Sequence, residues 1–234
     1  MAVQRLSLTN IIDLIRFYIA EPDADVSRLK NITDSSGTTA TLLLIINGYG
    51  QQISTRLGAL ARQEGLDLKS GKVYPDFWRT SGSLTTSKSS SSATFPSDYS
   101  KWISFYDRTN KKVIHPVEEI SRWRLDEYRN SPAGPTKAIE MLGVNSSSVI
   151  TSTLWPSVED EITPDIELIY WREPATMPGT SQSTEYPDAP PEFHMLWVYG
   201  AVLEIMRPDH PSFNRFQQKE QEMLTEMMRV SRAI

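Results

Sequence analysis

One stretch of the chain, residues 164–207, limits the possible folds more than any other part of the sequence. It begins with a predicted strand whose apolar side chains point to both faces: Ile166, Leu168 and Tyr170 to one, Ile169 and Trp171 to the other. A strand of this kind is covered on one side and partly covered on the other. We expect Pro174 to end it, because proline cannot donate a hydrogen bond to the ladder.

The second half of the stretch predicts a helix with almost no polar face, over about residues 189–207. Between Met195 and Met206 the only charged residue is Glu204. We expect Asp188 to cap this helix, with a pair of prolines in its first turn. A helix this apolar is buried on more than one side. We therefore expect one side to face the protein's own core and the other a neighbouring subunit.

Length and cysteine content set the broad class of protein. The chain has 234 residues, enough for one large domain or two small ones, and such a chain buries roughly 70–75% of its unfolded surface. It contains no cysteine, which excludes disulfides and thiolate metal sites. We expect no signal peptide, and no apolar run approaches the ~20 residues of a membrane span. The Asn-x-Ser/Thr matches at Asn31 and Asn145 therefore carry no weight as glycosylation sites.

The net charge of the chain is −5 and its pI is acidic. Proteins that grip nucleic acid do so mainly through a basic surface. The charge therefore argues against tight nucleic-acid binding, while it allows a surface past which DNA slides.

The N-terminal part of the chain predicts two helices. One apolar stripe, with Thr9 as its cap, indicates a helix over residues 9–20, and a longer stripe indicates a helix over residues 39–64. The second helix contains three glycines: Gly48, Gly50 and Gly58. Each costs about 1 kcal/mol relative to alanine, so we interpret them as a helix–helix contact, with a bend as the alternative.

The tail, residues 212–234, predicts a final amphipathic helix. Its apolar stripe consists of Phe213, Phe216, Met223, Leu224, Met227 and Met228. Methionine clusters are adaptable packing surfaces. We interpret the stripe as core, with the groove of a partner protein as the alternative.

The middle of the chain predicts mostly β structure. The strands expected are 102–106 and 113–115, which form a hairpin, then 149–155 and 166–172; residues 117–129 predict a short helix, and 138–142 fit a helix or a strand. The serine-rich stretch 81–94 is expected to bury almost nothing and to be mobile in isolation, with ordering against a partner as the alternative.

These elements predict an α+β fold, a helical bundle of N-terminal and C-terminal helices with a small antiparallel β-rich region inserted. We expect one domain over residues 1–234. Its parts are helical segments at about 1–65 and 188–234, a β-rich insertion at about 95–174 and a flexible loop at 81–94.

The sequence offers no constellation that supports catalysis. The three histidines are His115, His194 and His210, and none belongs to a metal-binding motif. Glu192 and His194 do not share a helix face. A stretch that begins at Asp23 resembles a calcium loop only faintly, because Arg28 replaces the turn glycine. We therefore expect a protein that is not an enzyme, with no catalytic, cofactor-binding or metal-binding residue and no cofactor.

The order of several segments resembles the bacteriophage head-to-tail adaptor, or connector, proteins. The matching pieces are the glycine-bearing helix near 45–47, Phe-Pro-Ser-Asp-Tyr at 95–99 before a strand, Leu-Trp-Pro at 154–156, the strand 166–174, and Pro-Pro-Glu-Phe-His at 190–194 opening an apolar helix that contains Tyr199. None of these pieces is catalytic, so their order carries the resemblance, over about residues 39–230. The serine-rich stretch 81–94 departs from the family pattern.

The resemblance implies a structural virion protein. Adaptors of this family look like helical bundles with a β insertion, and they form a homo-oligomeric ring, commonly a dodecamer, below the portal protein. The implied partners are the portal, a tail or nozzle protein, and double-stranded DNA that passes through the channel without sequence-specific binding, with no membrane. The implied location is the virion neck, between portal and tail, after synthesis in the host bacterial cytoplasm.

We also expect the C-terminal helix, or the segment after it, to contact the portal, while the β insertion or its loops face the tail. The reason is the Met/Phe stripe of residues 212–234, should part of it be exposed.

Two other functions fit the sequence. One is another neck or tail component, such as a stopper, a tail terminator or a tail-tube-associated protein; a tail terminator usually follows the sixfold order of the tail, whereas an adaptor matches the portal. The other is an α+β ligand-binding domain or enzyme. That function requires a pocket lined by convergent polar groups, and activity that is lost when His194 or Glu192 is replaced.

Overall fold

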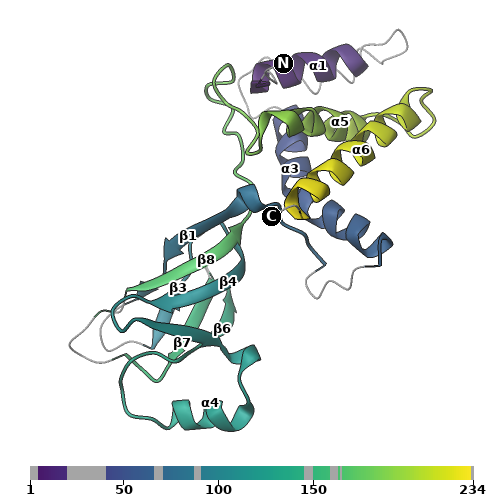
Figure 1. Ribbon diagram of the computed structural model, residues 1–234. Coiled ribbons are helices and arrows are strands. Elements are labelled where there is room, and N and C mark those ends of the chain that lie inside the picture. The colour runs from purple at the N-terminus through teal and green to yellow at the C-terminus, as the bar shows by residue number, and fades with distance from the viewer. Residues whose placement is uncertain are drawn as a thin grey trace. The chain divides into compact units, whose positions relative to one another are not determined.

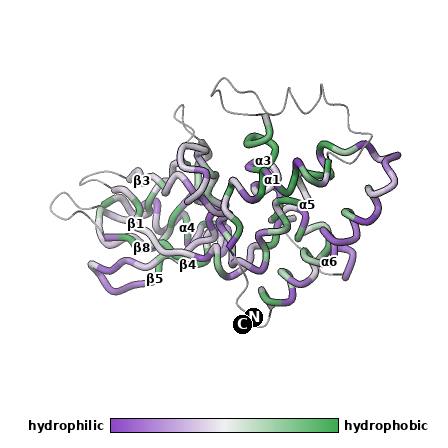
Figure 2. The backbone as a smooth tube through the Cα atoms, turned by 90° about the horizontal axis from the view of Figure 1, so that it is seen from above, coloured by the Kyte–Doolittle hydropathy of each residue, from purple (hydrophilic) through white to green (hydrophobic). Residues whose placement is uncertain are grey.

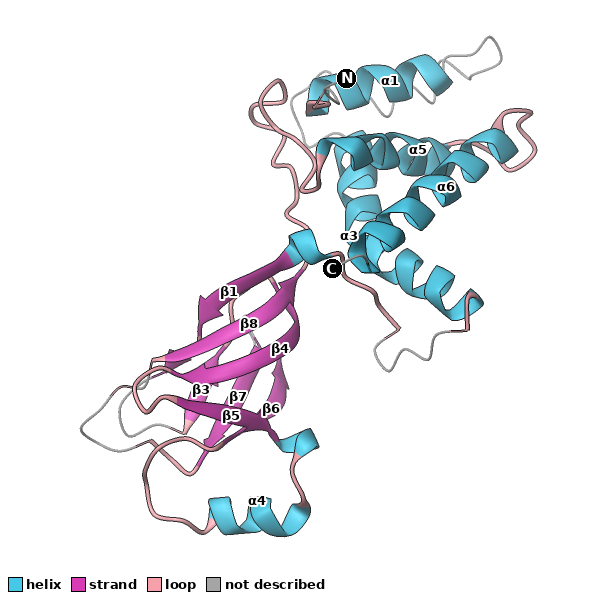
Figure 3. Ribbon diagram, viewed as in Figure 1, coloured by secondary structure: helices cyan, strands magenta, loops and turns pink. Residues whose placement is uncertain are grey.

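The computed structural model describes residues 5–19, 41–65, 71–86, 91–144, 150–158, 163 and 165–232. The chain divides into two compact units: residues 1–77 together with 174–234, and residues 78–173. The first unit is helical and the second is built on a sheet (Figures 1 and 3).

The helical unit is organised around one apolar helix. Its helices are α1 (Leu8–Ile19), α3 (Thr41–Gln63), α5 (His194–Ile205) and α6 (Phe213–Arg232). Helix α5 packs against α1, α3 and α6, and Figure 2 shows it as largely hydrophobic along its length. Most of its side chains, including Leu196, Trp197 and Val198, are buried.

The burial of α5 confirms the prediction of a helix covered on several sides and corrects its cause. The sequence suggested that one side of α5 would face a neighbouring subunit. Helices of the same chain cover it instead. Most of the stripe on α6 is likewise core, since Phe216, Leu224, Met227 and Met228 are buried. Phe213 and Met223 are only partly buried, so contact of α6 with the portal stays a prediction.

Two predicted helix caps are wrong. Helix α1 begins at Leu8, and the Oγ of Ser7, not Thr9, accepts the amide of Asn10 at 3.3 Å. Asp188 does not cap α5, because a 3-10 turn, Pro191–Phe193, precedes that helix and has no side-chain cap. Pro190 is the N-cap residue of that turn, and Pro191 is its first residue.

The glycines of α3 and α5 mark the closest approach of these two helices. A Cβ on Gly50 would reach the indole of Trp197, and a Cβ on Gly200 would overlap the ring of Tyr49. The predicted helix–helix contact is therefore confirmed at Gly50. Gly58 instead meets the backbone of Gly71, and Gly48 has open space beside it.

The described part of the second unit contains an eight-stranded sheet. The strands are β1 (Arg79–Ser83), β2 (Thr85–Thr86), β3 (Ser92–Thr94), β4 (Tyr99–Asp107), β5 (Lys112–Pro116), β6 (Ala138–Val144), β7 (Ile150–Trp155) and β8 (Ile166–Arg172). Their order is β1-β8-β4-β5-β6-β7-β3-β2. All neighbouring pairs are antiparallel except β5 and β6, which pair in parallel, so the sheet is mixed.

The sheet is nearly closed on itself, like a barrel (Figure 1). Its two edge strands, β1 and β2, are consecutive in the chain and are separated only by Leu84. The segment 79–86 therefore joins both edges, and Leu84 also donates its amide to Ile166 O at 2.9 Å. Few unpaired edge groups remain where a sheet closes in this way. Side chains from all around the sheet, among them Phe105, fill the interior.

This architecture corrects the predicted fold class. The fold is α+β, but it is not a helical bundle with a small antiparallel insertion, because the β unit holds an eight-stranded mixed sheet. The serine-rich stretch 81–94 was expected to bury almost nothing, whereas it contributes to β1, β2 and β3 and buries Leu84 and Ala93. Residues 87–90 lie outside the described part.

The remaining β predictions fare better. The hairpin of β4 and β5 and the strands β7 and β8 are confirmed, and residues 138–142 resolve as strand β6. The helix predicted over 117–129 is shorter, with a 3-10 turn at Val117–Glu119 followed by α4 (Arg122–Arg129). Helix α4 buries Leu125.

Candidate functional site

Directed polar contacts gather in the linker of residues 174–190, which precedes α5. Asn47 of α3 clamps it with two hydrogen bonds. Its amide nitrogen donates to Met177 O at 2.9 Å, and its amide oxygen accepts from Met177 N at 2.9 Å. A two-bond clamp fixes the linker backbone on α3, since both backbone polar groups of one residue, Met177, are satisfied at once.

Glu185 holds the turn within this linker. Its carboxylate accepts the amides of Gly179 and Ser181, both at 2.7 Å, and Gly179 has a φ of +79° that glycine adopts easily. Burial alone would raise the pKa of Glu185, but the donated amides outweigh it and keep that pKa below its ordinary value. The carboxylate therefore acts as a charged turn anchor.

His194 joins the linker to the N-terminal segment. Its Nδ1 accepts the amide of Leu6 at 3.0 Å, and its Nε2 lies 3.0 Å from Ala189 O, to which it donates. The residue is 1% exposed, and burial lowers its pKa. One neutral imidazole thus bridges two backbone segments that are about 180 residues apart in sequence.

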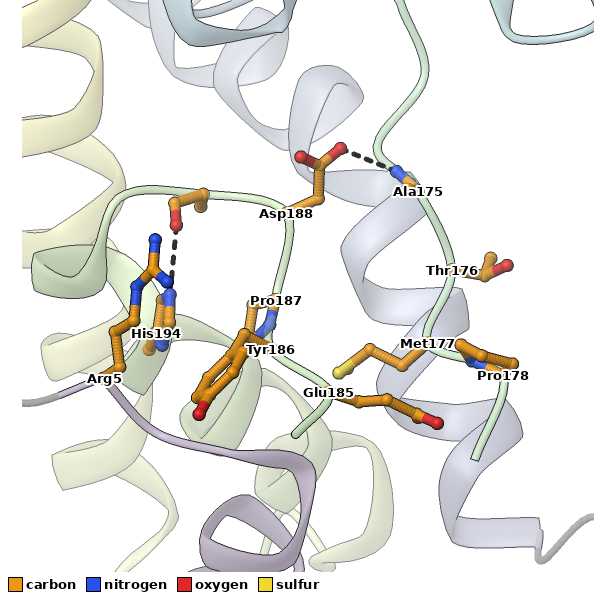
Figure 4. Close-up of a pocket in the computed structure, with 11 residues that line it drawn as sticks. Arg5, Ala175, Thr176, Met177, Pro178, Glu185, Tyr186, Pro187, Asp188 and His194 are labelled. Atoms are coloured by element: carbon orange, nitrogen blue, oxygen red, sulfur yellow. Dashed lines mark hydrogen bonds between the residues drawn. The ribbon is translucent and has the colours of Figure 1, made fainter. Parts of the chain in front are cut away.

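The same linker lines an open pocket of about 340 Å³. Its lining is Arg5, Ala175, Thr176, Met177, Pro178, Glu185, Tyr186, Pro187, Asp188, Ala189 and His194 (Figure 4). The guanidinium of Arg5 lies 5.5 Å from the centre of the Tyr186 ring, and Asp188 accepts the amide of Ala175 at 2.8 Å. Both contacts join two residues that line the pocket, so they stabilise the pocket wall.

The polar groups of the pocket serve its structure. His194 uses both ring nitrogens on backbone groups, Glu185 accepts two amides, and Glu192 is exposed. The pair that an enzyme would have needed, Glu192 with His194, is not joined by a hydrogen bond among those described. The arrangement can hold chain segments in place, which is a structural task.

A second polar cluster ties three helices together. Glu220 of α6 is 5% exposed, and its Oε1 accepts the hydroxyl of Tyr49 at 2.6 Å and the guanidinium of Arg56 at 2.9 Å. Arg56 also donates to Glu204 of α5 at 2.8 Å. Burial, followed by the charge of Glu220, raises the pKa of Tyr49. The cluster sets the register of α3, α5 and α6.

The β unit exposes two aromatic features. Trp123 of α4 is 65% exposed, with the guanidinium of Arg124 lying 5.4 Å from its ring. Tyr106 and Val113, which face each other across the hairpin of β4 and β5, are also exposed. Single exposed apolar side chains are ordinary on a protein surface, so these residues do not define a contact site by themselves.

The structure places the other sequence candidates apart. His115 lies exposed on β5, and His210 accepts the amide of Ser212 at 3.2 Å within a turn. The faint calcium loop, with Asp23 and Arg28, lies outside the described residues. In the part of the chain that the structure describes, no three His, Cys, Asp or Glu side chains gather so that they could hold a metal ion.

Sequence reasoning missed Asn47 and Glu185. Both sit among residues that are ordinary for their surroundings, Asn47 in a helix and Glu185 in a polar linker. One signal was available: Glu185 is the only acidic residue between Glu173 and Asp188, in a stretch of turn-forming residues.

Of the helices described, not one combines the length and the apolar character that a membrane span requires.

The fold and the linker define an α+β protein of two units whose polar side chains fix its own segments. The particular family follows from comparison with known proteins. Residues 6–233 match the family described as SU10 adaptor protein, so the chain belongs to this family of phage adaptor proteins. None of the curated proteins matches the chain.

Family membership confirms the resemblance found in the sequence. The chain is a structural adaptor of a bacteriophage and a component of the virion. It associates with other components of the phage neck.

Proposed function

We propose that the chain forms a closed ring below the portal, joins the phage head to the tail and extends the DNA channel. Twelve copies form the ring, one for each subunit of a twelvefold portal. The observation that carries this proposal is the family match, which runs through both compact units and omits only residues 1–5 and 234.

The proposed partners follow from that position in the neck. The ring contacts the portal on one side and a tail or nozzle protein on the other, and double-stranded DNA passes through it without sequence-specific binding. The acidic balance of the chain supports this role, because a net charge of −5 favours passage of DNA over retention.

We further propose that the chain is not an enzyme. The support is the use of His194, Glu185 and Asp188 as structural anchors, as described above. Replacement of these residues is then expected to change stability and assembly together.

A second candidate is another neck or tail component, such as a stopper or a tail terminator. The family match favours the adaptor. Symmetry separates the two, because we expect an adaptor to match the ring order of the portal, whereas a tail terminator usually follows the sixfold order of the tail.

Cryo-electron microscopy of the virion neck, without imposed symmetry, tests the proposal. We expect density for both the helical and the β unit of this chain, repeated twelve times directly below the portal. A sixfold ring of this chain at the end of the tail would contradict the adaptor role and favour the tail terminator.

A further inference from the structure

The N-terminal arm, defined as residues 5–19, is held by residues that come much later in the chain. Its backbone donates three hydrogen bonds: Leu6 N to His194 Nδ1 at 3.0 Å, Leu8 N to Glu185 O at 2.8 Å, and Thr9 N to Gln182 O at 3.1 Å. Further along, the ring of Tyr18 meets that of Phe216 edge to face at 5.1 Å. The arm therefore docks on the linker 174–190, on α5 and on α6.

The arm also buries a continuous apolar face. Leu8, Ile11 and Ile15 are at most 1% exposed, and α1 lies along one side of α5 (Figure 1). Burying three such side chains stabilises the docked arm, because their apolar surface is removed from water. The arm thus docks as one piece. We call the surface that it covers, formed by the linker 174–190, α5 and α6, its seat.

The connection between the arm and the next helix is long. Residues 20–40, which are 21 in number, separate Ile19 from Thr41. A segment of 21 residues spans at most about 70 Å. That limit exceeds the diameter of a single compact unit of this size, so covalent connection alone does not tie an arm to its own chain.

We propose that neighbouring copies in the ring exchange this arm, so that residues 5–19 of one copy occupy the seat of the next. The inference rests on the ring proposed above and adds what links its subunits. Each contact is the same within a chain or between chains, so exchange needs no additional interface. Every copy donates one arm and receives one, which closes the ring head to tail.

We expect the arm to dock on its own chain when the protein is dilute and free, and on the next copy when the ring has formed. In a dilute free chain the arm occupies its own seat, because a tether of this length gives an effective concentration near the millimolar range. In the proposed ring, the same tether, with its span of at most about 70 Å, also reaches the docking surface of the next copy. Each exchanged arm is covalently part of one copy and docks on the next, so exchange links neighbouring subunits and slows their dissociation.

Cysteine substitutions test this inference directly, because the chain contains no cysteine of its own. The bond from Thr9 N to Gln182 O brings two backbones within the range that a disulfide bridges. Chains with Thr9→Cys are mixed with chains with Gln182→Cys, assembled on portal rings, oxidised and analysed on a non-reducing gel. A chain with both substitutions shows whether this pair of positions can form the bond at all.

We expect mixed rings to yield a disulfide dimer of one chain of each kind, while the mixture before assembly yields none. The inference is overturned if the mixed rings give no dimer while the doubly substituted chain closes its own disulfide in the same rings. Equal dimer formation in rings of Thr9→Cys chains alone would also overturn it, since that bond arises by collision. Failure to form any ring would instead contradict the ring proposal on which the inference rests.

Discussion

At the scale of single residues, the buried His194 makes the stability of the fold depend on pH. Its Nδ1 must be unprotonated to accept the amide of Leu6, and its side chain is buried. Arg5 opposes its protonation and Glu192 favours it, but burial has the largest effect and lowers its pKa. The folded state therefore requires the neutral imidazole.

This requirement predicts a loss of stability in acid. An unfolded histidine has a pKa of about 6.5, so the unfolded chain takes up the proton first as the pH falls. The stabilisation from neutral His194 is complete above about pH 6.5 and is lost as the pH falls through the lower pKa of the folded state. We expect the free energy of unfolding in urea to drop from pH 7 to pH 5, and to drop less in His194→Gln.

Replacement of the exposed His115 by glutamine is the matched control for this experiment. We expect that variant to keep the pH dependence of the unchanged chain. Identical pH dependence in His194→Gln and in the unchanged chain would show that His194 does not couple folding to pH.

Two helical glycines are expected to respond to alanine in opposite ways. At Gly200 the added methyl group would overlap the ring of Tyr49, so we expect Gly200→Ala to lower the free energy of unfolding by about 1–3 kcal/mol. At Gly48 nothing lies within 4 Å, so we expect Gly48→Ala to raise it by up to about 1 kcal/mol. Urea denaturation measures both. A stabilising Gly200→Ala would refute the close contact between α3 and α5.

At the scale of whole elements, the start of α1 separates the sequence prediction from the structure. The side chain of Ser7 caps the helix, whereas Thr9 lies inside its first turn. Loss of a serine cap typically costs about 1 kcal/mol. We expect Ser7→Ala to destabilise the chain by about that amount in thermal denaturation, and Thr9→Ala to have little effect. The reverse order of the two variants would restore Thr9 as the cap.

Elements with strong periodicity were predictable from the sequence. The helices α1, α3 and α6 and the strands β7 and β8 show apolar repeats, which indicate the buried face, and α5 was recognised by its nearly unbroken run of apolar residues. Strands β1 to β3 consist mostly of serine and threonine, and the burial of Leu84 and Ala93 depends on partners far along the chain. Such long-range pairing leaves no local pattern, so the extent of the sheet was missed.

The site was predictable only in part, for a similar reason. His194 was recognised as an ordinary residue at the start of a helix, which agrees with its structural use. The clamp by Asn47 and the anchor by Glu185 depend on where the linker crosses α3. The place where the linker crosses α3 cannot be predicted from a single sequence.

At the scale of the whole molecule, the chain enters and leaves the β unit at adjacent points. Arg79, at its start, is the register partner of Trp171, near its end. Its core is also its own, built from residues within 78–173. Both features are typical of a unit that folds independently.

We therefore expect a fragment of residues 78–173 to fold alone. Circular dichroism should show β structure and a single cooperative thermal transition, because the core of the unit stays intact. An unfolded fragment would show that the β unit depends on the helical unit.

The central claim is that this chain assembles as a ring that matches the portal. The most direct test is the mass of isolated portal rings before and after addition of the full chain, measured by native mass spectrometry. The account predicts an increase of 26.5 kDa for each portal subunit, with no partly filled rings at saturation. Unchanged portal mass, or an increase that corresponds to six chains on a twelvefold portal, would contradict it.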